Sequence, residues 1–382
     1  MRTSSLWLFT PLLFFFIFAI ASATDDPSPP SSSSFLSLSL PSSALSPAKD
    51  EPTTAEEKEK IHEAFQRFMK DYQKSYPTKE ERTKAMQNFA ANWRELNGLL
   101  QSNANPEATF GVTKFFDMSL EEFARYPCGG DLATMGLPEE QVDEEELRKM
   151  TGVLMEDVIQ GKVPDSWDWT EHIGITVKDQ KACGSCWAFS TVGNVEGMWT
   201  KAGHHMKILS EQEFVDCSLS NHGCNGGWPF LAMGDIMKKP EKGMINTDEE
   251  YPYTARDESC VFRPKSAGVR IAGHTSYCRL GTQPCHPEMI KALVYRYGPV
   301  SACLNALPLV SYQSGILDPE KCKPDFINHC VTIVGYGEEK GLRFWKLKNS
   351  WGTEYGEDGF VRLAQGKCGV ERVITVAKLA LH

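Results

Sequence analysis

Cys183-Gly184-Ser185-Cys186-Trp187 is the stretch that decides the fold prediction for this 382-residue chain. Two cysteines flank a turn of small residues, and the apolar run that follows predicts a helix from Cys186 to Trp199. A thiol at the N-terminus of a helix loses its proton more readily, because the helix dipole stabilises the thiolate. We therefore interpret Cys186 as a candidate nucleophile.

A cysteine nucleophile needs a base and a group that orients it, and both candidates lie far along the chain. His329, one of nine histidines, begins a run that predicts a buried strand over residues 331–334. It follows Cys186 by about 143 residues, a spacing typical of cysteine proteases. Asn349 follows a second predicted strand, residues 344–348, and its amide could hold one imidazole nitrogen while the other faces the sulfur.

Gln180 and Trp351 complete the candidate site. Gln180 lies six residues before Cys186, and its amide together with the backbone N–H of Cys186 could stabilise the oxyanion of a tetrahedral intermediate. Trp351 follows Asn349 closely and could shield the His329–Asn349 contact from water.

These motifs as a set, with Gly223-Cys224-Asn225-Gly226-Gly227 and Asn349-Ser350-Trp351-Gly352, resemble the papain family in its cathepsin branch. The resemblance extends from about Ala55 to the C-terminus. It implies an α+β, papain-like fold of two lobes, with Cys186 on a helical lobe and His329 and Asn349 on a β-barrel-like lobe. It also implies that Cys186 is the nucleophile, His329 the general base and acid, Asn349 the orienting residue and Gln180 the oxyanion donor.

The first part of the chain resembles a cathepsin propeptide, so we expect a zymogen. Ala85 departs from the family, which usually has Arg there, and the motif over residues 111–117 is most similar to cathepsin F. The resemblance implies that residues 123–130 cross the cleft in reverse and block it. The residues that match the helical propeptide motifs are Phe65, Phe68, Tyr72, Tyr76, Glu81, Phe89 and Asn92.

Composition and hydropathy divide the chain into four parts. Residues 1–23 are typical of a secretory signal peptide, because their apolar run is short and ends at Ala21-Ser22-Ala23. Residues 24–54 read as a Ser/Pro-rich spacer, 55–162 as the inhibitory propeptide and 163–382 as the peptidase domain. We expect no membrane anchor and a location in a lysosome, in a vacuole or outside the cell. The net charge of −10, without a basic run, argues against nucleic acid as a partner.

Secretion makes the twelve cysteines candidates for disulfides. The resemblance implies the pairs Cys183–Cys224, Cys217–Cys260 and Cys322–Cys368, and it implies that Cys186 is free. Cys278 and Cys285 could close a short local loop. Cys303 and Cys330 are either free wall residues of a substrate pocket or bridged to each other, and Cys128 has no assigned partner.

The resemblance also implies the substrate class. Gly226 and Gly227 offer a backbone edge to an extended peptide, and the other lining residues are apolar or aromatic, which predicts an apolar P2 side chain. No inserted loop closes the site, so we expect an endopeptidase that acts on proteins and peptides as a monomer. We expect inhibition by its own propeptide and by cystatin-type inhibitors, and no cofactor or metal. The residues placed around the substrate are Trp228, Pro229, Cys303, Ile327, Cys330 and Trp351, with Val373 at the base of the pocket.

Three alternatives remain at this point. The chain could be a binding protein on an inactive protease fold, or a thiol–disulfide oxidoreductase that uses Cys183 and Cys186. The same two cysteines, with Cys217, His222 and Cys224 nearby, could instead form a zinc half-site. If the protease interpretation holds, we expect activation by acid, because protonating Asp117 and the run Asp143–Glu146 would weaken propeptide docking.

Overall fold

The computed structural model describes residues 54–101, 103–135, 144–240, 242–261, 268–278 and 283–380. The chain separates into two units, Met1–Pro52 and Thr53–His382, of which the second holds the described residues. The predicted signal peptide and nearly all of the predicted spacer lie outside them. Within the described part, no helix is both long and apolar enough to span a bilayer.

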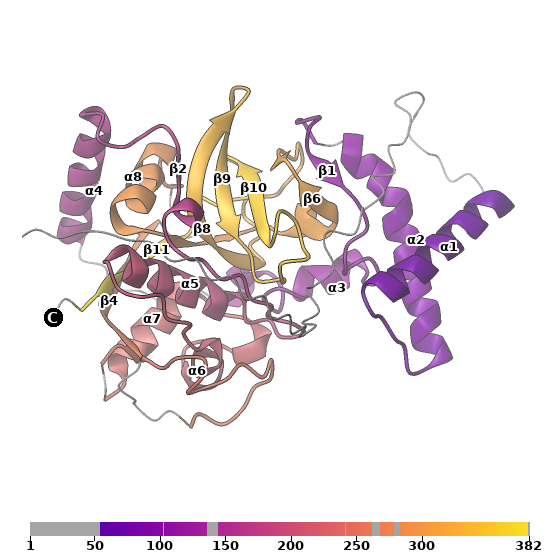
Figure 1. Cartoon of the computed structure of the whole chain (residues 1–382), viewed down its shortest axis with the longest axis horizontal. Helices are drawn as coiled ribbons and strands as arrows, with labels where there is room; N and C mark the ends of the chain where they lie inside the picture. The colour runs from indigo at the N-terminus through magenta and orange to yellow at the C-terminus, as the bar shows by residue number, and fades with distance from the viewer. Residues whose placement is uncertain are drawn as a thin grey trace, which may run out of the picture. The chain divides into compact units, whose positions relative to one another are not determined.

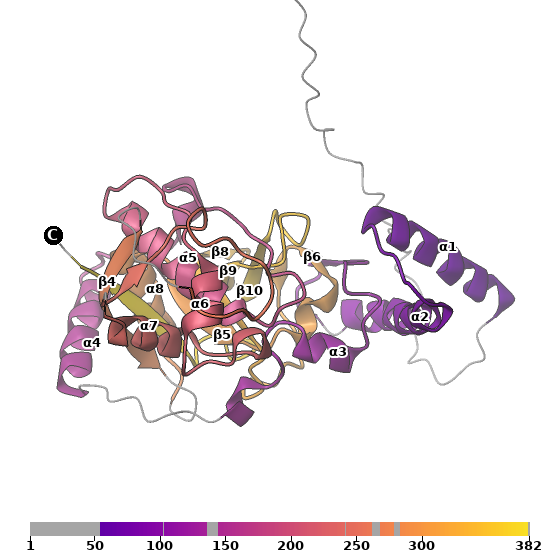
Figure 2. The same cartoon turned by 90° about the horizontal axis from the view of Figure 1, so that it is seen from below.

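The second unit begins with a small helical core of its own. Two helices, α1 (Ala55–Asp71) and α2 (Lys79–Gln101), pack through apolar faces spaced at three and four residues, as the sequence predicts. The turn at Pro77 separates them. Figures 1 and 2 show both helices at the end of this unit away from α4. The buried residues of this core, here called the α1–α2 core, are Ile61, Phe65, Phe68, Ala85, Phe89 and Phe116.

After α2, the chain contacts the strands and helices of the C-terminal part of this unit through three elements. Strand β1 (Thr109–Phe110) pairs antiparallel with β6 (Tyr312–Ser314), and a short helix, α3 (Leu120–Arg125), follows. Helix α4 (Glu144–Ile159) packs against α8 (Pro287–Tyr297). Residues 103–135 and 144–159 therefore contact the rest of the chain at several separate places.

A helical part and a sheet follow, which confirms the predicted α+β class. The helices of this part are α5 (Cys186–Lys201), α6 (Glu211–Cys217) and α7 (Pro229–Lys238). In the described residues the sheet has the strand order β3-β4-β11-β5-β8-β9-β10-β7, with β2 paired to β8. Its strands are β2 (Trp167–Asp168), β3 (Met244–Ile245), β4 (Val269–Cys278), β5 (Val300–Leu304), β7 (Ile316–Leu317), β8 (His329–Glu339), β9 (Leu342–Lys348), β10 (Phe360–Ala364) and β11 (Ile374–Leu379).

Helix α5 lies directly against strand β8, and small residues make this close approach possible. Ser190 donates its hydroxyl to the Val331 carbonyl at 2.6 Å. A Cβ at Gly193 would lie 2.7 Å from Thr332 Oγ1, so glycine is required there. This contact fixes the start of α5 relative to the start of β8, which are the positions of Cys186 and His329.

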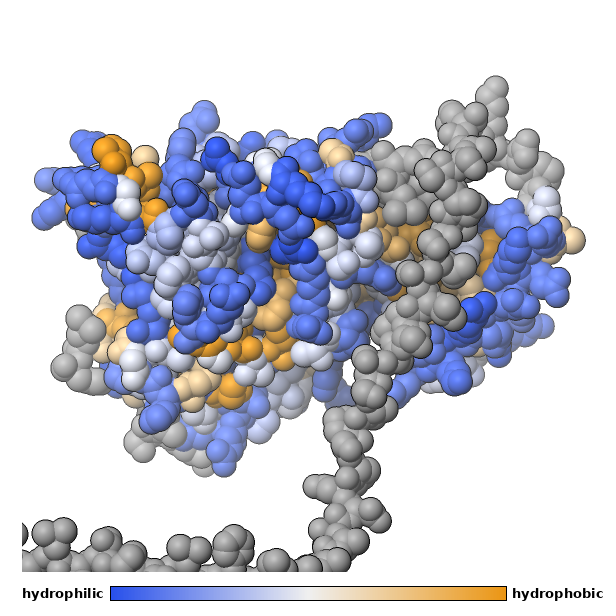
Figure 3. Space-filling model, turned by 45° about the horizontal axis from the view of Figure 1, so that its top comes forward, coloured by the Kyte–Doolittle hydropathy of each residue, from blue (hydrophilic) through white to orange (hydrophobic). Residues whose placement is uncertain are grey.

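The surface is mostly polar. Figure 3 shows hydrophilic side chains over most of the face it displays, with apolar residues gathered in small patches between them. Among the described residues the exposed large apolar side chains are scattered over several elements: Leu120, Val153, Ile159, Ile208, Leu219 and Val261. Such scattered exposure is normal for a folded protein.

Candidate active site

The predicted residues Cys186, His329, Asn349 and Gln180 meet in one place, although the sequence separates them widely. All four are almost fully buried, with exposed fractions of 0 to 2%. Cys186 is the first residue of α5, His329 the first of β8, and Asn349 follows the end of β9. The structure therefore brings the predicted set together at the ends of three elements.

His329 is held by the amide of Asn349. The Nε2 atom of His329 lies 2.7 Å from Asn349 Oδ1, so the ring N–H donates to the amide oxygen. The imidazole also stacks on Trp351, with ring centroids 4.8 Å apart. The buried Nδ1 atom has no hydrogen-bond partner among the described residues and is thus available as a base. Burial lowers the pKa of His329 from 6.5 to about 4, against the opposing effect of the Asn349 hydrogen bond.

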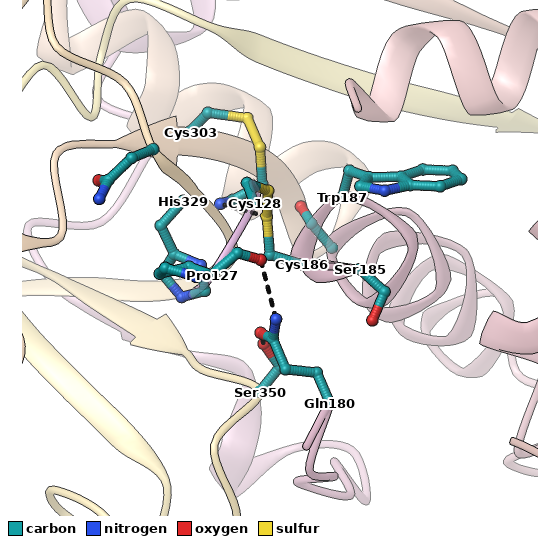
Figure 4. Close-up of a disulfide and its surroundings, with 12 residues drawn as sticks. Pro127, Cys128, Gln180, Ser185, Cys186, Trp187, Cys303, His329 and Ser350 are labelled. Carbon is teal, nitrogen blue, oxygen red and sulfur yellow. Dashed lines mark hydrogen bonds between the residues drawn. A yellow bond between two sulfur atoms is a disulfide. The ribbon is translucent and has the colours of Figure 1, made fainter. Parts of the chain in front are cut away.

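Gln180 points its amide nitrogen at a carbonyl of the propeptide region. Its Nε2 atom donates to the Pro127 carbonyl at 2.8 Å (Figure 4). The backbone N–H of Cys186 donates to the same oxygen at 3.4 Å. These are the two donors that the sequence assigns to an oxyanion. A backbone carbonyl therefore lies where the carbonyl of a bound peptide would be polarised.

Ser350 supports this geometry, although the sequence did not single it out. Its hydroxyl donates to Gln180 Oε1 at 2.7 Å, which fixes which end of the amide faces Pro127. The backbone N–H of Ser350 donates to Asn349 Oδ1 at 2.9 Å. Ser350 thus contacts both polar partners of the site, and its place in the string Asn349-Ser350-Trp351 was the available signal.

The expectation that Cys186 is free is wrong. In the structure its sulfur forms a disulfide with Cys128, as Figure 4 shows, and no described cysteine is free. The physical reason is the path of residues 126–130, which pass over the start of α5 and bring the side chain of Cys128 against Cys186. The other three expected pairs are present: Cys183–Cys224, Cys217–Cys260 and Cys322–Cys368.

The two open questions about cysteines are also answered by the structure. Cys278 is bonded to Cys285, and Cys303 is bonded to Cys330. The second bridge joins neighbouring strands β5 and β8, where the two residues lie opposite each other. Cys183 and Cys186 are each bonded elsewhere, so in this state they form neither a redox pair nor a zinc half-site.

The residues predicted to line a substrate pocket are buried, and one of them, Cys330, contacts Cys186. Cys330 donates its backbone N–H to Cys186 Sγ at 3.3 Å, and Ile327 accepts a backbone hydrogen bond from Leu132 at 2.6 Å. Gly226 adopts a φ of 110° at the end of a short turn, which favours glycine. The remaining members, Gly227, Trp228, Pro229, Cys303 and Trp351, are buried as well.

Aromatic side chains of the propeptide region cover Trp351. Phe115 and Phe123 lie edge-on to its ring, with centroid distances of 4.8 and 5.7 Å. Lys114 donates to the Trp351 carbonyl at 2.6 Å and pairs with Asp179 at 2.9 Å. The segment expected to block the site therefore contacts Trp351, beside His329, as well as Cys186.

Comparison with known proteins agrees with this geometry. Residues 163–378 match the model of the papain family cysteine protease, and residues 65–123 match the cathepsin propeptide inhibitor domain (I29). Cysteine proteinase B of Leishmania mexicana is 37% identical over 79% of this chain, and mouse cathepsin F (Mus musculus) is 33% identical over 83%. The chain spans 65% of the length of each of these two relatives.

Solved structures of precursor forms are similar over most of the chain. The digestive procathepsin L 3 of Tenebrio molitor larval midgut has a TM-score of 0.67 at 28% identity, covering 84% of this chain and 99% of that one. The proform of the ragweed pollen allergen Amb a 11, a cysteine protease, has a TM-score of 0.70 at 26% identity, covering 85% and 94%. The chain therefore belongs to the papain family of cysteine proteases, in its cathepsin branch, and carries a cathepsin-type propeptide.

Proposed function

We propose that this chain is the inactive precursor of a cysteine endopeptidase. The observation that carries the proposal is the Pro127 carbonyl, which Gln180 Nε2 and the backbone N–H of Cys186 hold directly in front of the nucleophile. A peptide carbonyl bound in that position is oriented for attack by the sulfur and polarised for it. The His329–Asn349 pair then supplies the base and its orienting group.

The reaction proceeds in two stages. His329 takes the proton of the Cys186 thiol and the resulting thiolate attacks the scissile carbonyl, whose oxyanion accepts hydrogen bonds from Gln180 and the Cys186 backbone. His329 gives a proton to the leaving amine, so that an acyl-enzyme forms on Cys186. His329 then takes a proton from water, which hydrolyses the acyl-enzyme and restores the thiol.

Substrate choice follows from the apolar residues beside Cys186. Trp228, Ile327 and the Cys303–Cys330 bridge favour an apolar P2 residue, and burying such a side chain contributes about 1.5–3 kcal/mol. We expect Leu, Val or Phe at P2 to be cleaved well and Arg poorly. Without an occluding insertion, cleavage occurs within chains.

The precursor form sets the remaining expectations. The mature enzyme begins near Val163 and is a monomer. It travels through the secretory pathway to a lysosome, to a vacuole or out of the cell. Cystatin-type inhibitors bind it. Acid promotes activation, and the candidate carboxylate is Asp117, which accepts hydrogen bonds from Lys74 at 3.0 Å and from Tyr76 at 2.9 Å within the propeptide. The acidic run Asp143–Glu146, also expected to act here, begins outside the described residues.

The test uses purified precursor incubated at acid pH with a thiol reductant and assayed on peptides with Leu or Arg at P2. Cys186→Ala should abolish turnover. Gln180→Ala should lower kcat by about a hundredfold or more, as expected for loss of one oxyanion donor. Ser220→Ala, a substitution at a residue bonded to Asp235 rather than to the site, is the control. Activity that survives Cys186→Ala, or equal cleavage of both peptides, would contradict the proposal.

A binding protein on an inactive protease fold is the second candidate, and the same assay separates it. It predicts that reduced, processed protein turns over no peptide and that an epoxide probe for reactive thiols labels no hyperreactive cysteine. The geometry favours the enzyme, because His329 is held by the Asn349 amide, and Gln180 Nε2 and the backbone N–H of Cys186 converge on one carbonyl oxygen.

A further inference from the structure

We propose that Cys128 is a covalent inhibitor of the nucleophile, and that the Cys128–Cys186 disulfide is a thiol-exchange site that a reducing thiol must open before the precursor can act. This inference rests on the proposed function through the role of Cys186. It goes beyond that function, because a propeptide that only docks leaves the nucleophile chemically intact. Here the nucleophilic atom itself is in a bond to the propeptide.

The backbone around Cys128 is built to turn its side chain into the site. Helix α3 ends at Arg125, and the Arg125 carbonyl accepts the N–H of Gly129 at 2.7 Å, which closes a turn around Pro127 and Cys128. Gly129 and Gly130 have φ values of 73° and 133°, a region that favours glycine. A Cβ at Gly129 would lie 2.1 Å from the Asn225 carbonyl oxygen. Glycine is thus required at position 129 for this close passage and is favoured by the backbone at position 130.

Hydrogen bonds on both sides hold this turn to the peptidase domain. Before Cys128, the Ala124 carbonyl accepts from Asn328 Nδ2 at 3.0 Å. After it, Asp131 Oδ1 accepts from the Ile327 N–H at 3.2 Å. The Cα atoms of Cys128 and Cys186 are 5.8 Å apart, a usual separation for a disulfide. Oxidation of the two thiols therefore needs no rearrangement of the docked propeptide.

The neighbouring sulfur atoms form a cluster, but in this state the cluster has no thiolate. The sulfurs of Cys128, Cys186 and Cys330 lie within 4.8 Å of one another, a spacing that could hold a metal ion. Cys330 is bonded to Cys303, and the other two are bonded to each other. Because a cysteine ligand or nucleophile must be a thiolate, the cluster is inert to metals and substrates until a disulfide opens.

Opening the disulfide consumes two thiols and transfers two electrons. A thiolate of the reductant attacks Cys128 Sγ, the Cys186 sulfur leaves as a thiolate, and a mixed disulfide remains on Cys128. A second reductant thiolate attacks the mixed disulfide at the reductant's sulfur and releases Cys128. The sum is one protein disulfide and two reductant thiols converted into two protein thiols and one reductant disulfide.

Burial makes this exchange depend on a prior movement of the propeptide. Cys128 and Cys186 are each 0% exposed, so a reductant reaches neither sulfur in the docked form. The turn over residues 126–132 must open first. We therefore expect acid alone to fail, because it loosens docking without breaking the bond. A reductant at neutral pH should act slowly, because the turn opens rarely.

The activity test compares the precursor with Cys128→Ser at acid pH in thiol-free, chelated buffer. The wild type should stay unlabelled by an epoxide thiol probe until a reductant is added, whereas Cys128→Ser should be labelled at Cys186 without one. Phe123→Ala is the matched control: it loosens the same segment but keeps Cys128, so it should still need the reductant. Labelling of the wild type without reductant, at the rate of Cys128→Ser, would overturn the proposal.

A thiol count gives an answer that does not depend on activity or on how Cys128→Ser folds. Denatured wild-type precursor should have no free thiol, and Cys186→Ala should have one, which peptide mapping places at Cys128. The wild-type map should show the peptides of Cys128 and Cys186 linked. Free Cys128 or Cys186 in the wild type would overturn the proposal. If instead the linkage is found and the reduced enzyme cleaves nothing, the proposed function fails and the disulfide assignment stands.

Discussion

At the scale of single residues, Ser350 shows how the site depends on a side chain that performs no chemistry. Its hydroxyl donates to Gln180 Oε1, so the amide nitrogen faces the Pro127 carbonyl, where we propose that a substrate carbonyl binds. Ser350→Ala should remove one of the contacts that orient the Gln180 amide, the other being the bond from Gln180 Nε2 to the Cys183 carbonyl at 2.8 Å. It should lower kcat by about tenfold, the equivalent of one hydrogen bond, with little change in KM. The measurement is steady-state kinetics of the reduced, processed enzyme.

The control for Ser350 is the conservative variant. Ser350→Thr keeps the hydroxyl and should restore most of kcat, which a general packing defect at this buried position would not allow. A rise in KM with unchanged kcat in Ser350→Ala would show that the residue acts on substrate binding instead.

His329 gives the docked precursor a dependence on pH. Burial lowers its pKa to about 4 from 6.5, so the docked form binds fewer protons than a form in which the imidazole is exposed. Above pH 6.5 the imidazole is neutral in both forms, and the docked form has its full stability. As the pH falls towards 4, only the exposed imidazole gains a proton, so the docked form loses stability relative to the open one. The loss amounts to about 3 kcal/mol at the lower end.

The measurement is the free energy of unfolding of the precursor between pH 7 and pH 4. The Cys186→Ala variant is used because it cannot cleave itself. Adding His329→Gln should reduce the loss of stability over this window, whereas His62→Gln, on the exposed face of α1, should not. A histidine NMR titration that places the midpoint of His329 near 6.5 in the precursor would contradict the expectation.

The residues of the site differ in how far sequence could predict them. Cys186, His329 and Asn349 could be predicted because each lies at the end of a strongly patterned helix or strand. The role of Cys128 could not, because it depends on where an irregular segment passes in space. One signal was available: once the other ten cysteines are paired, Cys128 and Cys186 are the two that remain.

At the scale of elements, α3 contacts the peptidase domain through the aromatic side chain of Phe123 as well as through the Ala124 carbonyl. Phe123 is 0% exposed and packs against Phe115 and Trp351. Phe123→Ala should lower the free energy of unfolding of the precursor by about 3 kcal/mol, as expected when a buried phenylalanine leaves a cavity. Denaturant unfolding in the Cys186→Ala background measures this.

A second position on the same helix provides the comparison. Leu120 is 53% exposed, so Leu120→Ala removes little buried surface and should change the stability by about 0.5 kcal/mol or less. Equal losses for the two variants would mean that α3 stabilises the precursor through its helical structure and not through its contact with Trp351.

Local sequence patterns predict where helices and strands begin and end better than they predict which elements contact one another. The three- and four-residue spacing of Ile61, Phe65 and Phe68 predicts α1, and the apolar run after His329 predicts β8. The pairing of β1 with β6 joins residues about 200 positions apart and has two residues in its first strand. A strand that short has no periodicity from which to predict it.

At the scale of the whole molecule, the described residues form two separate hydrophobic cores. The larger one contains Phe115, Phe123 and Leu154 of the propeptide region together with the interior of the peptidase domain. The α1–α2 core is distinct from it. The crossing segment is therefore part of the enzyme's own core, whereas α1 and α2 are stabilised mainly by each other.

This division predicts that the precursor opens in stages. Phe89 is 0% exposed at the centre of the α1–α2 core, with its ring 5.4 Å from Phe65 and 5.8 Å from Phe116. Phe89→Ala should raise amide hydrogen exchange across α1 and α2, because a local loss of about 3 kcal/mol makes that core the least stable unit. Exchange in α5 and β8 should stay at the wild-type rate, since neither element contributes to this core.

Phe123→Ala is the comparison, because it should raise exchange around α3 and Trp351 while α1 and α2 keep their protection. If Phe89→Ala instead raised exchange equally in all four elements, the two cores would unfold as one unit, and acid could not loosen the propeptide while the peptidase domain stays folded.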